Sequence, residues 1–286
     1  MRSAAAELVE RREIVPGTWL HAWHAPGVVV GARAGQYVHL RTVEPGGLPV
    51  RRPLPIATAD PASGTLTTQA PGAPPGRGWV NGLRVGDRAE LLGPLGRPFE
   101  VDPRSRHLLL VAEGSAIGSL RLLVDEAIRD GRSVVLLYGA AEATQVYPSS
   151  LLPDEVEYVV ATADGSLGHR GSILDLVLDY EAWADQSFAA GPPSLLGGLA
   201  RLAAGRRDRM GVATLGRKRG GGRPVAPGSP EARRKAFLQV VPEQRVGCAA
   251  GTCLGCAVPG AGGAALRVCR EGPVFAAEEL AWEEAG

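Results

Sequence analysis

Short apolar stretches separated by turn residues fill the first hundred positions. Residues that favour strands gather at 28–30, 36–41, 64–68 and 88–92. Clusters of Pro and Gly separate these stretches at 44–47, 71–72 and 74–76. The segment 51–56 is expected to end a further strand in a fixed turn. This pattern predicts an antiparallel β-barrel or sandwich over residues 1–103.

The pattern changes at Pro103. Unbroken apolar runs, typical of buried parallel strands, occur at 107–112, 133–139, 157–162 and 186–190. Helical spacing is present at 120–128, where Gly131 ends the helix, and near 172–179. Strands that alternate with helices predict a Rossmann-like α/β nucleotide-binding domain over residues 104–205.

Residues 206–236 are rich in Gly and Arg and predict a basic linker. A docking surface for an acidic partner or an anionic cofactor is the alternative for this segment. A small C-terminal module, residues 237–286, follows it.

Composition narrows the function classes. The 31 basic and 30 acidic residues give a net charge of +1, which does not favour nucleic acid as a partner. No apolar run is long enough for a transmembrane helix, and the charged N-terminus lacks the apolar core of a signal peptide. We therefore expect a cytoplasmic protein that does not enter a membrane.

All four cysteines lie in the C-terminal module, in the order Cys248-x4-Cys253-x2-Cys256-x12-Cys269. This spacing is typical of plant-type [2Fe-2S] centres. Small residues around the first three thiols leave room for a loop that wraps two irons: Gly247, Ala249, Ala250, Gly251 and Gly255. A zinc site is the alternative, although zinc usually takes paired C-x2-C knuckles and only one is present.

A [2Fe-2S] cluster carries single electrons, so the barrel and the α/β domain are expected to hold a flavin and a nicotinamide. Arg52 could bind a diphosphate while Pro53, Leu54 and Pro55 hold the backbone rigid against a flavin ring. The remaining candidate cofactor-binding residues of the barrel are Thr68, Gln69, Ala70, Gly76 and Arg77. Ordinary surface turns would explain the Arg52 and Gly76 segments equally well.

The α/β domain lacks the Gly-x-Gly-x-x-Gly fingerprint of dinucleotide-binding folds. Gly114 and Ser115 could still place a phosphate at a helix start. Asp164, Gly191 and Pro192 follow predicted strands and would line the same crevice.

Four segments together resemble a known family. They are Cys248–Cys256, 267–275, 91–99 and Thr162-x-Asp164-Gly165-Ser166-x-Gly168. The chain resembles the electron-transfer subunits of class 1B dihydroorotate dehydrogenases, which belong to the ferredoxin–NADP reductase superfamily. The resemblance implies FAD in the barrel, NAD(H) in the α/β domain and one [2Fe-2S] cluster at the C-terminus. It also implies a partner catalytic subunit that contains FMN and oxidises dihydroorotate in pyrimidine biosynthesis, in a heterotetramer, with no catalytic residue in this chain.

The chain departs from that family at cofactor positions. Pro55 replaces a serine, Gly76-Arg77 replaces Gly-Thr, and Ala190 replaces a cysteine. Glu113 stands in a turn that is usually Gly-Gly-x-Gly, which brings a carboxylate to the expected phosphate site. An electron-transfer subunit of another NAD(P)H-linked complex, or a non-enzymatic metal-binding protein with a degenerate nucleotide fold, remains an alternative.

Overall fold

The computed structural model describes residues 2–43, 49–70, 79–209, 229–243 and 246–282.

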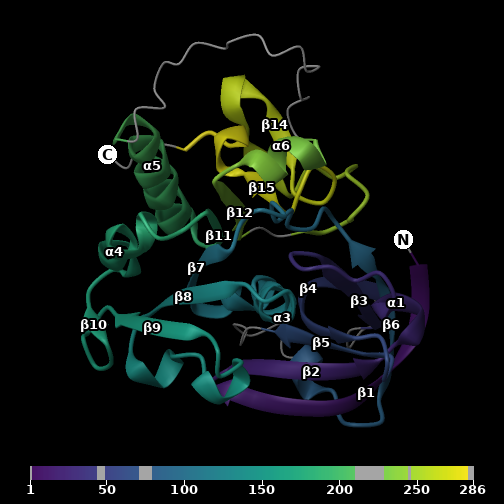
Figure 1. Ribbon diagram of the computed structural model, residues 1–286. Coiled ribbons are helices and arrows are strands. Elements are labelled where there is room, and N and C mark those ends of the chain that lie inside the picture. Colours follow the sequence, from purple (N-terminus) through teal and green to yellow (C-terminus); the bar gives the residue numbers. More distant parts are fainter. Residues whose placement is uncertain (1, 44–48, 71–78, 210–228, 244–245, 283–286) are drawn as a thin grey trace.

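The N-terminal part of the chain forms a barrel. Six antiparallel strands close in the order β1-β2-β5-β4-β3-β6 (Figure 1). The elements are β1 Arg2–Val15, β2 Thr18–His24, α1 Pro26–Val29, β3 Tyr37–Val43, β4 Pro49–Asp60, β5 Thr65–Ala70, α2 Trp79–Gly82 and β6 Arg88–Leu95. Fully buried side chains such as Trp23, Leu40 and Ile56 fill it.

Two sequence predictions in the barrel were wrong. Residues 28–30 do not form a strand, because Pro26 begins a short helix whose buried residues are Val28 and Val29. The segment 51–56 does not end a strand either, because β4 continues to Asp60. Strand β4 pairs with β3 up to Pro55 and with β5 only from Ile56, so Pro53 and Pro55 lie where β4 has one neighbour.

The second part is a seven-stranded sheet in the order β10-β9-β8-β7-β11-β12-β15, parallel except for the last pair. Its strands are β7 His107–Glu113, β8 Ser133–Ala140, β9 Glu157–Thr162, β10 His169–Arg170, β11 Gln186–Gly191, β12 Leu238–Pro242 and β15 Phe275–Ala276. The helices are α3 Arg121–Arg129, α4 Val177–Glu181, α5 Pro193–Arg209 and α6 Pro230–Lys235. Short 3-10 helices are η1 Gly114–Ser119, η2 Ala143–Gln145, η3 Ser149–Leu151, η4 Ile173–Leu176, η5 Ala261–Gly263 and η6 Ala277–Glu279.

Alternate residues of the sheet face two different layers, as the two-residue period of a strand requires. Leu108 and Leu110 pack in one core with the barrel and α3. Leu109 and Val111 pack in a second core with α4, α5 and the C-terminal module. The predicted barrel plus Rossmann-like α/β arrangement is therefore confirmed.

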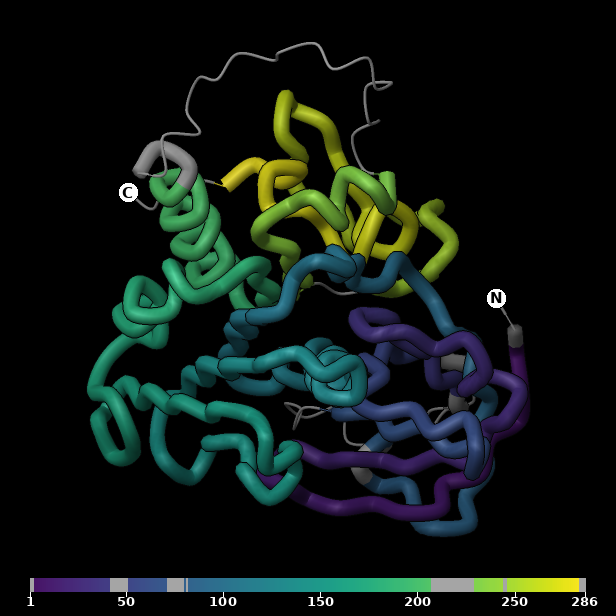
Figure 2. The backbone as a smooth tube through the Cα atoms, viewed as in Figure 1, coloured from purple at the N-terminus to yellow at the C-terminus, as the bar shows by residue number. Residues whose placement is uncertain are grey.

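The C-terminal segment lies against both other parts (Figure 2). It supplies the edge strands β12 and β15 of the large sheet and a small hairpin, β13 Ala257–Pro259 with β14 Ala265–Arg267. Of the predicted linker, 210–228 lies outside the described residues, and the rest includes the end of α5 and the whole of α6. The domain boundaries at 103, 205 and 236 stay predictions.

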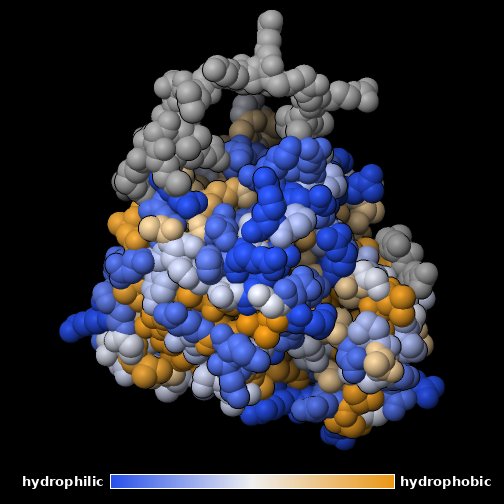
Figure 3. Space-filling model, viewed as in Figure 1, coloured by the Kyte–Doolittle hydropathy of each residue, from blue (hydrophilic) through white to orange (hydrophobic). Residues whose placement is uncertain are grey.

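Polar residues cover much of the visible surface. Figure 3 shows hydrophilic residues gathered in the upper part of one face, where Figure 1 places α6. Helix α5, the longest described helix with 17 residues, and the shorter described helices lack the length and apolar character that crossing a bilayer requires.

A tight contact joins the barrel to the C-terminal module. The backbone N–H of Arg97 donates a hydrogen bond of 2.7 Å to the carbonyl oxygen of Gly272. Gly96 has φ +83°, and a Cβ there would lie 2.2 Å from Cδ of Pro273 and 3.1 Å from Cε1 of Tyr37. Only a residue without a side chain allows this approach.

We expect Gly96→Ala to lower the free energy of unfolding by about 1–3 kcal/mol more than Gly131→Ala does. Gly131 also has a positive φ, +69°, but a Cβ there meets nothing within 4 Å. Comparing the two variants therefore separates the cost of the clash at position 96 from the cost of placing alanine at a positive φ. Denaturant unfolding of both variants measures the difference, and equal losses would show that the contact is not tight.

Candidate functional site

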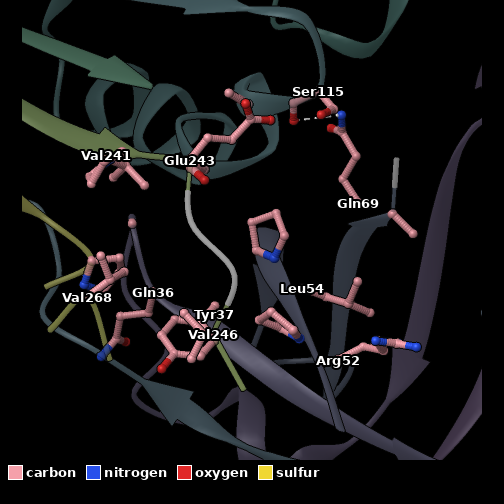
Figure 4. A pocket seen from close by; sticks show the side chains of 18 of the residues that line it. Gln36, Tyr37, Arg52, Leu54, Gln69, Ser115, Val241, Glu243, Val246 and Val268 are labelled. Carbon is pink, nitrogen blue, oxygen red and sulfur yellow. Dashed lines mark hydrogen bonds between the residues drawn. The ribbon is translucent and has the colours of Figure 1, made fainter. Parts of the chain in front are cut away.

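A cavity of about 680 Å³ lies where the three parts of the chain meet (Figure 4). One wall comes from β3, β4 and β5 of the barrel, and a second comes from η1 of the α/β part. The third wall comes from the C-terminal segment, including Val246, Gly247, Val268 and Pro273. The volume is in the range of small-molecule and cofactor sites.

The barrel wall carries cations and a rigid backbone. Arg51 and Arg52 both line the cavity, and Pro53, Leu54 and Pro55 follow them. Guanidinium groups suit a diphosphate, and a proline-rich strand presents a flat surface with few backbone donors. These residue types fit a flavin dinucleotide.

Gln69 lies between the barrel wall and the α/β wall. Its Nε2 donates a hydrogen bond of 3.1 Å to the carbonyl oxygen of Ser115, drawn as a dashed line in Figure 4. Its buried Oε1 has no hydrogen-bond partner within the described part of the chain. A buried acceptor of this kind is satisfied when a donor on a bound group reaches it.

The structure gathers seven of the predicted cofactor residues around the cavity: Arg52, Pro53, Leu54, Pro55, Gln69, Ala70 and Ser115. Thr68 does not line it, because its hydroxyl accepts a hydrogen bond of 3.0 Å from Nε1 of Trp23 in the barrel core. Gly76 and Arg77 lie outside the described residues. Gln36, Tyr37 and Glu243 line the cavity and were missed. The pairing of Tyr37 with Pro55 places it there, and this register cannot be read from the sequence.

The remaining nucleotide candidates lie outside the cavity lining. Gly191 ends β11 and Pro192 follows it, while Asp164 lies in the turn after β9. The Asp164 carboxylate accepts hydrogen bonds from the backbone N–H and hydroxyl of Ser166. Gly114, with φ +56°, begins η1 directly after β7. All four therefore follow or end strands of one parallel sheet.

Glu113 is the last residue of β7, at the same edge of the sheet. A Cβ on Gly191 would lie 3.6 Å from Cβ of Glu113, and one on Gly139 would lie 3.5 Å from its Cγ. Burial raises the pKa of Glu113, and the negative charge of Glu243 raises it further. This edge of the sheet thus holds a carboxylate that takes up a proton more readily than an ordinary glutamate.

The cysteine loop turns sharply around its thiols. Ala249, Gly251 and Leu254 all have positive φ, from +54° to +79°. Backbone N–H groups of Ala250 and Gly255 point to Sγ of Cys248 at 3.4 Å and of Cys253 at 3.5 Å. Hydrogen bonds from the backbone N–H groups of Cys253 and Ala250 and from the Thr252 side chain lower the pKa of Cys248 to about 5.

The four thiols form two pairs. The side chain of Cys248 interacts with that of Cys253, and the side chain of Cys269 interacts with that of Cys256. Within the described residues, no three or more His, Cys, Asp or Glu side chains are grouped so as to hold one metal ion. Two pairs of thiolates fit a two-iron cluster, in which each iron takes two cysteines, better than one tetrahedral zinc.

Comparison with known proteins decides the family. Residues 243–281 match the model of the iron-sulfur cluster binding domain of dihydroorotate dehydrogenase B. The electron transfer subunit of dihydroorotate dehydrogenase B (NAD+) from Geobacillus thermodenitrificans is 30% identical over 250 residues, 86% of each chain. The chain belongs to this family. The subunit of the same name from Desulforamulus reducens is 27% identical over 276 residues, covering 94% of this chain and 95% of its own.

Two solved structures have a fold similar to that of this chain. An NADH-dependent reduced ferredoxin-NADP oxidoreductase has a TM-score of 0.75 at 22% identity, covering 98% of this chain and 90% of its own. A ferredoxin NADP+ reductase from Neisseria gonorrhoeae, solved with FAD and NADP, has a TM-score of 0.58 at 16% identity over 77% of this chain and 95% of its own. The family resemblance drawn from the sequence is confirmed.

We expect Arg52→Ala to weaken FAD binding about 10- to 100-fold, because a charge-assisted contact to the diphosphate is lost. Flavin content after gel filtration and a fluorescence titration with FAD measure the change. Arg41→Ala is the matched control, because Arg41 pairs with Glu90 at 2.8 Å and does not line the cavity. Unchanged FAD affinity in Arg52→Ala would remove Arg52 from the site.

We expect Cys253→Ser to abolish cluster assembly, because a hydroxyl replaces one of the four thiolate ligands. Iron and sulfide per chain, with the visible spectrum, measure the loss. Leu254→Ala changes the next residue of the same loop, whose side chain is 61% exposed, and should keep the cluster. A full complement of iron in Cys253→Ser would contradict the ligand assignment.

Proposed function

We propose that the chain passes electrons between a partner dihydroorotate dehydrogenase and NAD through a [2Fe-2S] cluster and FAD. The observation that supports this proposal is that the cavity and the cysteine site are in contact. Gly247 and Val268 line the cavity, and each directly precedes a cysteine of the cluster site. One short wall of the protein therefore separates the two sites.

The residues of the chain bind and orient the two groups. Arg51 and Arg52 hold the diphosphate, Pro53–Pro55 form the flat wall, and Gln69 offers its carbonyl oxygen. Cys248, Cys253, Cys256 and Cys269 hold the two irons. When bound, FAD supplies hydride chemistry and the cluster supplies single-electron transfer. No side chain of this chain is required as a general acid or base on dihydroorotate.

The crevice above Gly114 and Ser115 takes the nicotinamide nucleotide, with Asp164, Gly191 and Pro192 around it. The catalytic partner holds FMN, oxidises dihydroorotate and joins this chain in a heterotetramer. The complex acts in the cytoplasm, in pyrimidine biosynthesis. These statements extend the family assignment to this chain.

The experiment is coexpression with candidate catalytic subunits and purification of the complex. We expect flavin, about two irons per chain, and bleaching of the visible spectrum when NADH is added without oxygen. Dihydroorotate should then reduce NAD+ in the complete complex and not in the isolated chain.

Other outcomes separate the alternatives. Bleaching by NADH with a different copurifying oxidoreductase, and no activity with dihydroorotate, would assign the chain to another NAD(P)H-linked complex. Zinc in place of iron, with no flavin, would contradict the electron-transfer function altogether.

A further inference from the structure

Tyr37 stands between the flavin cavity and the cysteine site. It is the first residue of β3, its side chain is 6% exposed, and it lines the cavity. Its ring packs near Gly96, beside the Gly272–Pro273 segment that follows Cys269. Figure 4 shows it on the cavity wall next to Val246.

The same ring belongs to the core that contains the buried cysteines. Tyr37 shares this apolar cluster with Val268, Cys256 and Cys269. The side chain is close enough that thiolate charges of Cys269, Cys256 and Cys248 add to the effect of burial and raise the pKa of Tyr37. The charged groups that act on this hydroxyl are therefore the expected cluster ligands.

The hydroxyl of Tyr37 is buried and has no hydrogen-bond partner among the described residues. Other tyrosine hydroxyls do have partners: that of Tyr158 donates to the carbonyl oxygen of Tyr147 at 2.9 Å, and that of Tyr180 to Glu157 at 2.7 Å. A buried hydroxyl without a partner is costly, so an acceptor from a bound group is expected.

We propose that the Tyr37 hydroxyl donates a hydrogen bond to a sulfur of the cysteine-bound cluster and thereby raises the cluster's reduction potential. This inference rests on the proposed function, because it requires the cluster. Reduction adds one negative charge to the cluster, and a donor aimed at sulfur stabilises the reduced form more than the oxidised form. Tyr37 is a tuning residue and takes no part in the chemistry of the substrate.

The test is Tyr37→Phe, which keeps the ring and removes only the donor. We expect normal iron and flavin content and a cluster that is harder to reduce. At a fixed ambient potential the ratio of reduced to oxidised cluster should fall about tenfold, which is about 59 mV for one electron. An anaerobic redox titration followed by electron paramagnetic resonance measures this ratio.

Tyr158→Phe is the matched control, because it removes a tyrosine hydroxyl from β9, a strand of the α/β part. Its cluster potential should equal that of the unaltered protein. An unchanged cluster potential in Tyr37→Phe, or a shift confined to the flavin, would overturn the inference and leave the proposed function intact. Absence of iron in the unaltered protein would instead reject the proposed function.

Discussion

Two buried glutamine side chains hold the segment that joins the barrel to the sheet, and the cavity depends on them. Gln239 exchanges hydrogen bonds of 2.9 and 2.6 Å with the backbone of Glu100. Gln186 accepts from the N–H of Asp102 at 2.9 Å and donates to the carbonyl oxygen of Ala236 at 3.0 Å. Since each unmade bond would leave a buried polar group unsatisfied, this network fixes the barrel, the sheet and the C-terminal segment relative to one another. The walls of the cavity come from these same three parts.

Much of the fold was predictable because its strands follow simple patterns. The apolar runs that became β7, β8 and β11 are buried along most of their length, as expected of central strands in a parallel sheet, and the run that became β9 is only partly buried. Strand β1 was missed because alanine and charged residues, which are poor strand formers, make up most of Arg2–Val15. Its alternating burial, with Ala6 and Leu8 inside, depends on pairing with β2 and β6.

Site residues could be predicted where they are neighbours in the sequence. They could not be predicted where strand pairing brings distant residues together. The cysteine spacing and the Arg52–Pro55 run are read directly from consecutive residues. Tyr37 and Glu243 join the cavity only through the pairing of β3 with β4 and the approach of the loop after β12. The pairing of the four thiols likewise needs the hairpin that returns Cys269 to Cys256.

The departures from the family pattern have different physical consequences. Pro55 lines the cavity and lacks the hydroxyl that a serine would offer to a bound group. Glu113 instead brings a carboxylate to the sheet edge where dinucleotide phosphates are expected, and the charge of Glu243 acts on it. Because its pKa is raised, lowering the pH neutralises Glu113 before it neutralises an ordinary glutamate, and this weakens its repulsion of phosphates. Nucleotide binding should therefore respond to pH through Glu113.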